Sequence, residues 1–544
     1  MSQIARPRAG NQLGGSEAVA SVNVGGASFT NPRWIWASAN DYHVVSSGGI
    51  TTSAQFPAFR RKTRIAGGRW AALAPVYLAA SIQSNRTPAG ASLDLANHTI
   101  CGALEMSNGT EPTVFGSSNV GGTKIACTWG TVDEILVSGG MLVIGDPIYA
   151  SAASLPFFEF TNRNLLPWER LGVSKAAAAN VLASGNTIQE YNAPWNSRAK
   201  SEASFAAVKS TTMGADGSQG GGAGQYGLSD GADCSGFLGW IGIPLSGQKA
   251  TMFTGTSIIQ GTGDNNNRQG GVDPAGNTFA NYDLIGWPCR WAESLTKSAP
   301  VLNFAIGGSG AVSLWNPSGN DWGSSSDAAL SREVVANLAQ YFDFFQVHDP
   351  QNDNISTIRA SLETAIRMVR ASNPAIKIFS VKVPNGGPTM AGGSTAYDSG
   401  NLNPKYAIYD TLFTEKKIDY QLDLRIDAAN TFVTRANIES GTTTALGTTT
   451  TLIDTTKNWV RNFWVNQWVE IAGVKQRITA NTATQLPFTA YGGAVASATA
   501  YAINGNTSDD QLHPSTYGHR VMAAAFETEQ LRVGMNIPSF TRTK

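Results

Sequence analysis

The pattern of apolar and polar positions changes at about residue 246, where short apolar runs begin to alternate with segments of helical periodicity. The apolar runs predict strands at 251–254, 301–305, 341–347 and 376–383. The periodic segments predict helices at 287–297, 331–339 and 355–372, and Asn373-Pro374 stops the last one. Strands and helices in alternation indicate βαβ units, and therefore a parallel sheet covered on both faces. Sites in such sheets gather at the carboxyl ends of the strands.

Two other stretches have the character of β-structure. Residues 1–245 predict mostly short strands and loops, including a hairpin in which 135–137 and 141–144 flank Ser138-Gly139-Gly140. Residues 439–505 are rich in Thr, Val and aromatic residues, with Gly and Asn turns and no helical periodicity.

These patterns predict the domain organisation. We expect a β-rich N-terminal region (1–245), then a catalytic domain in two parts (246–438 and 506–544). A small β-module (439–505) is inserted between the two parts. Helical periodicity returns directly after Pro514.

Composition narrows the classes of function. The 544 residues include 39 Lys and Arg and 39 Asp and Glu, and no basic cluster, so the electrostatic footprint of a nucleic-acid-binding protein is missing. No apolar run approaches the ~20 residues that a membrane helix needs. The first residues contain no apolar secretory segment. The four cysteines and five histidines show no metal-ligand spacing, and we expect no metal site.

Residues far apart in the sequence form a candidate hydrolytic centre. In Asp510-Gln511-Leu512-His513, one short loop carries a base and a carboxylate that can orient it. Ser257 follows an apolar run, where a nucleophile at a strand-to-turn transition would lie. Ser, Asp and His in this chain order can build a hydrolytic triad. Candidate oxyanion donors are the Ser257 N–H, glycines within 303–310 and a side-chain amide within 346–353.

Four blocks in this order resemble those of the SGNH (GDSL-like) hydrolase superfamily: Gly255-x-Ser257, Asn303-x₄-Gly308, Asn352-Asp353 and Asp510-x-x-His513-Pro514. The resemblance covers 246–438 and 506–544 and implies a flavodoxin-like three-layer α/β/α fold. It implies that Ser257 is the nucleophile, His513 the base and Asp510 the orienting carboxylate. It also implies that the oxyanion donors are the N–H groups of Ser257 and Gly308 and the side-chain amide of Asn352. It implies no cofactor.

Two positions depart from the family pattern. Thr256 stands where the family usually has an Asp that braces the nucleophile loop. Pro350-Gln351 stands where a Gly-x pair is usual, so Asn354 competes with Asn352 for the role of the third donor.

The expected function is that of a serine esterase. The family accepts lipids, acyl thioesters and acetylated sugars. The absence of an apolar lid argues against a lipase, and the added β-modules favour a polymer, so we expect an acetylated polysaccharide as substrate. Which residues bind that substrate remains open.

A further resemblance concerns the source of the protein. The stretch 448–478 is similar to small β-modules of bacteriophage structural proteins, and the whole arrangement resembles phage tailspikes and fibres. This implies a virion-bound deacetylase that contacts other virion proteins and forms a homo-oligomer, a trimer if it is tailspike-like. Two alternatives stay open: a structural or glycan-binding virion protein with an inactive hydrolase domain, and a cytoplasmic esterase or thioesterase.

Overall fold

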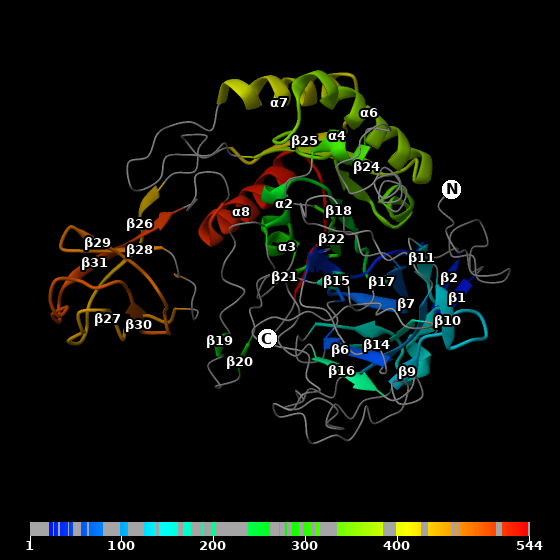
Figure 1. Cartoon of the computed structure of the whole chain (residues 1–544), viewed down its shortest axis with the longest axis horizontal. Helices are drawn as coiled ribbons and strands as arrows, with labels where there is room; N and C mark the ends of the chain where they lie inside the picture. The colour runs from blue at the N-terminus through cyan, green and yellow to red at the C-terminus, as the bar shows by residue number, and fades with distance from the viewer. Residues whose placement is uncertain are drawn as a thin grey trace.

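A computed structural model describes the chain in segments. These are 21–24, 27–30, 33–41, 43–46, 56–62, 65–79, 98–106, 124–137, 141–161, 167–175, 186–189, 198–202, 238–261, 271–272, 278–279, 286–292, 297–305, 310–315, 335–383, 399–425, 434–459, 464, 467–506 and 514–541. The architecture is mixed α/β with several sheets (Figure 1).

A six-stranded parallel sheet lies at the centre of the 246–438 part. Its spatial order is β25 (Tyr420–Asp423), β24 (Lys377–Lys382), β23 (Phe344–Gln346), β18 (Thr251–Phe253), β22 (Val301–Asn303) and β4 (Ala39–Asp41). Every neighbouring pair is parallel. The predicted parallel sheet is therefore present, and it includes one strand from the N-terminal region.

Helices pack on both faces of this sheet because its strands are apolar on both sides. Met252 and Phe345 belong to a core cluster shared with α6 (Ile355–Ser372) and α7 (Ser399–Thr414). Their neighbours Phe253 and Phe344 point to the opposite face. There they join a second cluster with α3 (Trp287–Ala292) and α8 (Thr516–Arg532). The remaining short elements of this part are α2 (Ser257–Gln260), α4 (Ala311–Trp315), η6 (Ala339–Tyr341), β19 (Gly271–Val272), β20 (Thr278–Phe279), β21 (Lys297–Ser298) and β32 (Phe540–Thr541).

The predicted helix 355–372 coincides with α6, whose C-cap is Asn373. The predicted helix 287–297 extends too far, because Lys297 begins β21, which pairs with β32. The predicted strand 341–347 starts too early, since Tyr341 ends the 3₁₀ turn η6 and β23 begins at Phe344.

Two antiparallel six-stranded sheets form most of the described part of the N-terminal region. The first contains β10 (Glu134–Val137), β8 (His98–Glu105), β14 (Trp168–Lys175), β6 (Phe56–Lys62) and β16 (Arg198–Glu202), with β9 (Lys124–Ala126) on β8. The second contains β11 (Met141–Ile144), β7 (Arg69–Ala79), β17 (Gly239–Pro244) and β3 (Ile35–Trp36), with β12 (Ile148–Tyr149) and β13 (Phe158–Glu159) on β7. Residues of both sheets, such as Ile100 and Leu73, belong to one core cluster.

The smaller elements of this region are β1 (Ser21–Val24), β2 (Ala27–Thr30), β5 (His43–Ser46), β15 (Asn186–Gln189) and η2 (Ala150–Ala153). The predicted hairpin of 135–137 with 141–144 is wrong. These residues lie in β10 and β11, which pair with β8 and β7 in different sheets. Each of them pairs along its whole length and thereby joins a six-stranded sheet with a buried core, whereas an isolated two-stranded hairpin is only marginally stable.

The inserted module has its own sheets and its own core. It contains β26 (Thr434–Thr442), β27 (Thr451–Ile453), β28 (Trp468–Ile471), β29 (Val474–Arg477), β30 (Gln485–Pro487) and β31 (Ala500–Asn506). Its buried side chains form a cluster that includes Trp459, Trp464 and Tyr501. The entry and exit strands β26 and β31 pair antiparallel, from Thr434–Asn506 to Thr442–Ala500 (Figure 1). The two ends of this segment therefore lie side by side, and its regular elements, among the residues described, are strands.

Candidate active site

Ser257 lies just beyond the carboxyl end of β18, where it is the first residue of the short helix α2. It is partly buried, whereas Thr254, Gly255 and Thr256 before it are buried. Gly255 is required by close packing, because a Cβ there would lie 2.5 Å from Asp349 Oδ1 and 2.3 Å from Ile259 Cγ1. The turn that carries Ser257 is thus pressed against the segment that follows β23.

Asp349 holds this turn through two hydrogen bonds. The Thr256 N–H donates to Asp349 Oδ1 at 2.6 Å, and Thr256 Oγ1 lies 2.7 Å from Asp349 Oδ2. Both residues are wholly buried. Burial raises the pKa of the Asp349 carboxyl, while the charge of His348 and the bonds from Thr256 act in the opposite direction. The carboxylate absent at position 256 is therefore supplied from position 349.

A second carboxylate of the same segment holds the neighbouring loop. Asp353 Oδ2 accepts from the Ala311 N–H at 2.8 Å, and its Oδ1 accepts from the Val312 N–H at 2.9 Å. A Cβ at Gly310 would lie 2.3 Å from Asp353 Oδ1, so the backbone approaches the carboxylate closely. Asp353 thereby holds the first residues of α4, which follow Gly308 in the chain; Gly308 itself lies outside the described residues.

Asn352 lies between these two anchoring carboxylates. It is exposed, while Gln351 and Asp353 on either side are buried. Asn354, its competitor, is the N-cap of α6, and its Oδ1 accepts from the Ser356 N–H at 3.2 Å. The Asn354 side chain is therefore engaged as a helix cap, and the role of Asn352 as an oxyanion donor remains a prediction.

Two side chains of α7 bond to the backbone of the segment 348–353. Lys405 is 4% exposed, and its ammonium donates to the Gln351 carbonyl at 3.1 Å. Burial lowers the pKa of Lys405, and the charge of Asp353 opposes that shift. The Tyr409 hydroxyl donates to the His348 carbonyl. The backbone of the segment 348–353 is therefore held at two carbonyl groups by side chains of α7.

Asp510 and His513 lie outside the described residues, so their predicted roles remain predictions. The chain on either side of them is described. The strand β31 ends at Asn506, and Ser515 caps α8 by accepting from the Gly518 N–H at 3.1 Å. Farther along α8, the buried His519 accepts from the Trp287 N–H through Nδ1 at 3.2 Å, which ties α8 to α3.

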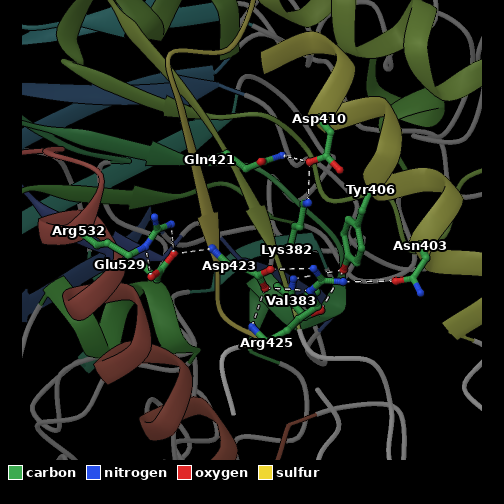
Figure 2. A network of polar contacts seen from close by, with 10 residues as sticks. All are labelled: Lys382, Val383, Asn403, Tyr406, Asp410, Gln421, Asp423, Arg425, Glu529 and Arg532. Atoms are coloured by element: carbon green, nitrogen blue, oxygen red, sulfur yellow. Dashed lines mark hydrogen bonds and ion pairs between the residues drawn. The ribbon is translucent and has the colours of Figure 1, made fainter. Parts of the chain in front are cut away.

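A second polar cluster lies at the carboxyl ends of β24 and β25 (Figure 2). Arg425 donates to Asp423 at 2.7 Å and 2.9 Å, and its guanidinium lies 5.0 Å from the centre of the Tyr406 ring. Buried Glu529 of α8 accepts from the Asp423 N–H at 3.0 Å and from Arg532 at 2.6 Å and 2.7 Å. The outer contacts of the cluster are Arg425–Asn403, Lys382–Asp410, Gln421–Asp410 and Tyr406–Val383. These bonds fasten α7 and α8 to the sheet.

Sequence reasoning overlooked Asp349 and Lys405. Asp349 lies two residues after a predicted strand, and a carboxyl group at that position was an available signal. Its partner Thr256 lies 93 positions away, and local sequence does not reveal such a pairing.

Among the described residues, no group of three or more His, Cys, Asp or Glu side chains is arranged to hold a metal ion. In that same part of the chain, no helix is both long and apolar enough to cross a membrane.

No family model and no curated protein matches the chain. Solved structures similar to it include a provisional GDSL-like lipase from Bacteroides ovatus, with 8% identity, 94% of this chain and 100% of that chain covered, and a TM-score of 0.29. A salicylyl-acyltransferase from a tetracycline biosynthetic pathway has 10% identity, 89% and 83% coverage and a TM-score of 0.28. A family two carbohydrate esterase from Clostridium thermocellum has 10% identity, 72% and 88% coverage and a TM-score of 0.24. At this level of likeness we assign no activity and no site residue from them.

Proposed function

We propose that the chain is a serine ester hydrolase of the SGNH type that removes acetyl groups from a polysaccharide. The observation that carries the proposal is the junction of the Ser257 turn with the Asn352 turn through Asp349. A candidate nucleophile and a candidate oxyanion donor thus lie on adjacent loops at the carboxyl edge of a parallel sheet, where sites of such sheets form.

The fold supports the same proposal. Numbered along the catalytic part, the strand order is 2-1-3-4-5, with β4 added beyond strand 2. This is the order of flavodoxin-like sheets. Ser257 follows strand 1 and Asn352 follows strand 3. The first and third sequence blocks therefore follow two strands, β18 and β23, that are neighbours in the sheet.

In the proposed reaction, His513 accepts the Ser257 proton as Oγ attacks the ester carbonyl, and Asp510 orients the imidazole. The Ser257 and Gly308 N–H groups and Asn352 Nδ2 bind the oxyanion of the tetrahedral intermediate. His513 gives this proton to the sugar oxygen as the acyl C–O bond breaks, so that the sugar leaves with a free hydroxyl and an acetyl-enzyme remains. Water, deprotonated by the same imidazole, then releases acetate. The reaction needs no cofactor.

The inactive alternative rested on Thr256 and on the irregular third block. The bonds of Thr256 to Asp349 weaken its first support, and the use of Asn354 as a cap weakens the second. The association with a phage virion and the trimeric state remain part of the proposal, supported by the resemblance of the inserted module. Light scattering of the purified chain tests the oligomeric state.

The decisive experiment measures hydrolysis of p-nitrophenyl acetate, of longer p-nitrophenyl acyl esters and of an acetylated polysaccharide. The parent is compared with Ser257→Ala. We expect preference for acetyl, and a loss of at least ~10³-fold in the variant, since the nucleophile carries the covalent route. Equal rates in parent and variant, or no release of acetate from any substrate, would contradict the proposal.

A further inference from the structure

We propose that Asp349, acting through Thr256, is the positioning residue that sets the direction of the Ser257 side chain. This inference rests on the proposed function and adds a residue to it. Asp349 does not touch the reacting atoms. It acts on the residue before the nucleophile, through both the backbone and the side chain of Thr256.

The two bonds restrain complementary parts of the turn. The backbone bond fixes the plane of the peptide that enters Thr256, and the hydroxyl bond fixes the side chain of the same residue. Thr256 is extended, with φ −85° and ψ −167°, and Ser257 is already helical. The change of direction that presents Ser257 therefore occurs at the residue that Asp349 holds.

Burial makes this brace difficult to replace. Thr256 and Asp349 are both 0% exposed, so water cannot take over a lost bond without rearrangement of the turn. The only further polar contact of the Thr256 hydroxyl among the described residues is Gln351 Oε1 at 3.5 Å, which is at the limit of a hydrogen bond. Loss of Asp349 as an acceptor therefore leaves Thr256 without an equivalent partner there.

The turn also supplies a matched control. Thr254 is buried like Thr256 and also has one bonded hydroxyl, but that hydroxyl donates to the Gln346 carbonyl at 2.9 Å instead of to Asp349. Thr254→Val and Thr256→Val each remove one buried hydroxyl from the same turn without changing its volume much. Only the second change removes a bond to Asp349.

The experiment compares kcat, KM and thermal unfolding of these two variants on p-nitrophenyl acetate. We expect Thr256→Val to lower kcat by roughly 10- to 100-fold with little change in KM, since misplacement of a reacting group by about 1 Å can cost 10²-fold. Thr254→Val should lower the unfolding temperature comparably and keep kcat within about threefold. Thr256→Ser, which keeps the hydroxyl, should restore kcat. Equal kcat in the two Val variants would overturn the proposal.

A double-mutant comparison tests whether Asp349 acts through Thr256. Asp349→Leu should lower kcat at least as far as Thr256→Val, and adding Thr256→Val to Asp349→Leu should lower it no further. Additive losses would show that the two residues act independently, and would overturn the proposal.

Hydrogen exchange separates this inference from the proposed function. The amides of residues 255–258 should exchange faster in Thr256→Val than in Thr254→Val, whether or not the chain hydrolyses esters. If the parent is inactive but this difference is present, the brace stands and the proposed function fails. If the parent is active and exchange in the two variants is equal, the brace fails and the proposed function stands.

Discussion

The two polar clusters at the carboxyl edge of the parallel sheet use their carboxylates in different ways. Beside Ser257, Asp349 and Asp353 accept hydrogen bonds from backbone N–H groups, and Asp349 also bonds a hydroxyl. At the ends of β24 and β25, Asp423 and Glu529 are paired with arginine side chains, in addition to accepting one backbone N–H bond each (Figure 2).

This difference corresponds to what each cluster holds in place. A bond to a backbone N–H fixes the path of a loop, and the loops beside Ser257 carry the candidate donors and nucleophile. In the second cluster the arginine pairs are local, from Arg425 to Asp423 and from Arg532 to Glu529. The Asp423 N–H joins β25 to Glu529 of α8, and these two elements carry none of the candidate site residues. We therefore expect the first cluster to bear on rate and the second on stability.

Within this comparison, the largest effect on kcat is expected at Asn352, the exposed residue between Asp349 and Asp353. Replacing Asn352 by Ala should lower kcat on p-nitrophenyl acetate by about 10²–10³-fold, as loss of one oxyanion donor typically does. Asn354→Ala is the control, because it removes the α6 cap and should cost only about 0.5–2 kcal/mol of stability. If Asn354→Ala has the kinetic effect and Asn352→Ala does not, the third block is displaced by two residues.

Matched changes of carboxylate to amide compare the two clusters directly. Asp353→Asn leaves a single acceptor oxygen for the N–H groups of Ala311 and Val312, which now use both oxygens. We expect the N-terminus of α4, which follows Gly308 in the chain, to shift, with a fall of about tenfold or more in kcat/KM. Unfolding measured on the same sample should change little beyond the loss of one buried hydrogen bond.

Glu529→Gln, in contrast to Asp353→Asn, should lower stability and leave kcat/KM unchanged. Burial alone would raise the pKa of Glu529, but hydrogen bonds from Arg532 and the Asp423 N–H hold it below its ordinary value. The variant should lose about 1–3 kcal/mol of unfolding free energy at neutral pH and keep its kcat/KM. A carboxyl group whose pKa is lower in the folded state stabilises the folded protein at pH values above its ordinary pKa. That stabilisation is lost as the pH falls from the ordinary pKa through the folded-state pKa. The gap between parent and variant should therefore narrow below about pH 4.5. A large kinetic loss in Glu529→Gln would erase the distinction between the clusters.

The smallest effect on a small ester is expected from removal of the inserted module. Because β26 and β31 run side by side, a short Gly/Ser bridge can replace residues 440–504. We expect p-nitrophenyl acetate turnover to stay largely intact and activity on acetylated polysaccharide to fall sharply, since remote contacts help a polymer more than a small ester. Equal activity of the deletion and the parent on polymer would assign the module a role other than substrate recognition.

Much of the catalytic fold could be predicted because its signals are local. The helix α6 has a clear apolar stripe and an Asn-Pro stop, and the predicted and observed ranges agree. The hairpin at 135–144 could not be predicted correctly, because both of its strands pair with distant partners. Likewise, the hydroxyl of Thr256 could not identify its distant carboxylate, Asp349, from local pattern. Ser257 and Asn352 lie at the predicted edge of the sheet, whereas Gly308, Asp510 and His513 remain predictions.

The strand β4 links the folding of the N-terminal region to that of the parallel sheet. Ala39–Asp41 leaves the ribosome long before Val301–Asn303, with which it pairs in the finished sheet. Trp36 beside it donates through Nε1 to the Val301 carbonyl at 3.0 Å, so the N-terminal segment is fitted to a surface that does not yet exist when it emerges. A fragment that starts at residue 246 would keep β22 but expose its outer edge, and an unpaired edge is a template for association with other chains. Residues 246–544 expressed alone should therefore aggregate.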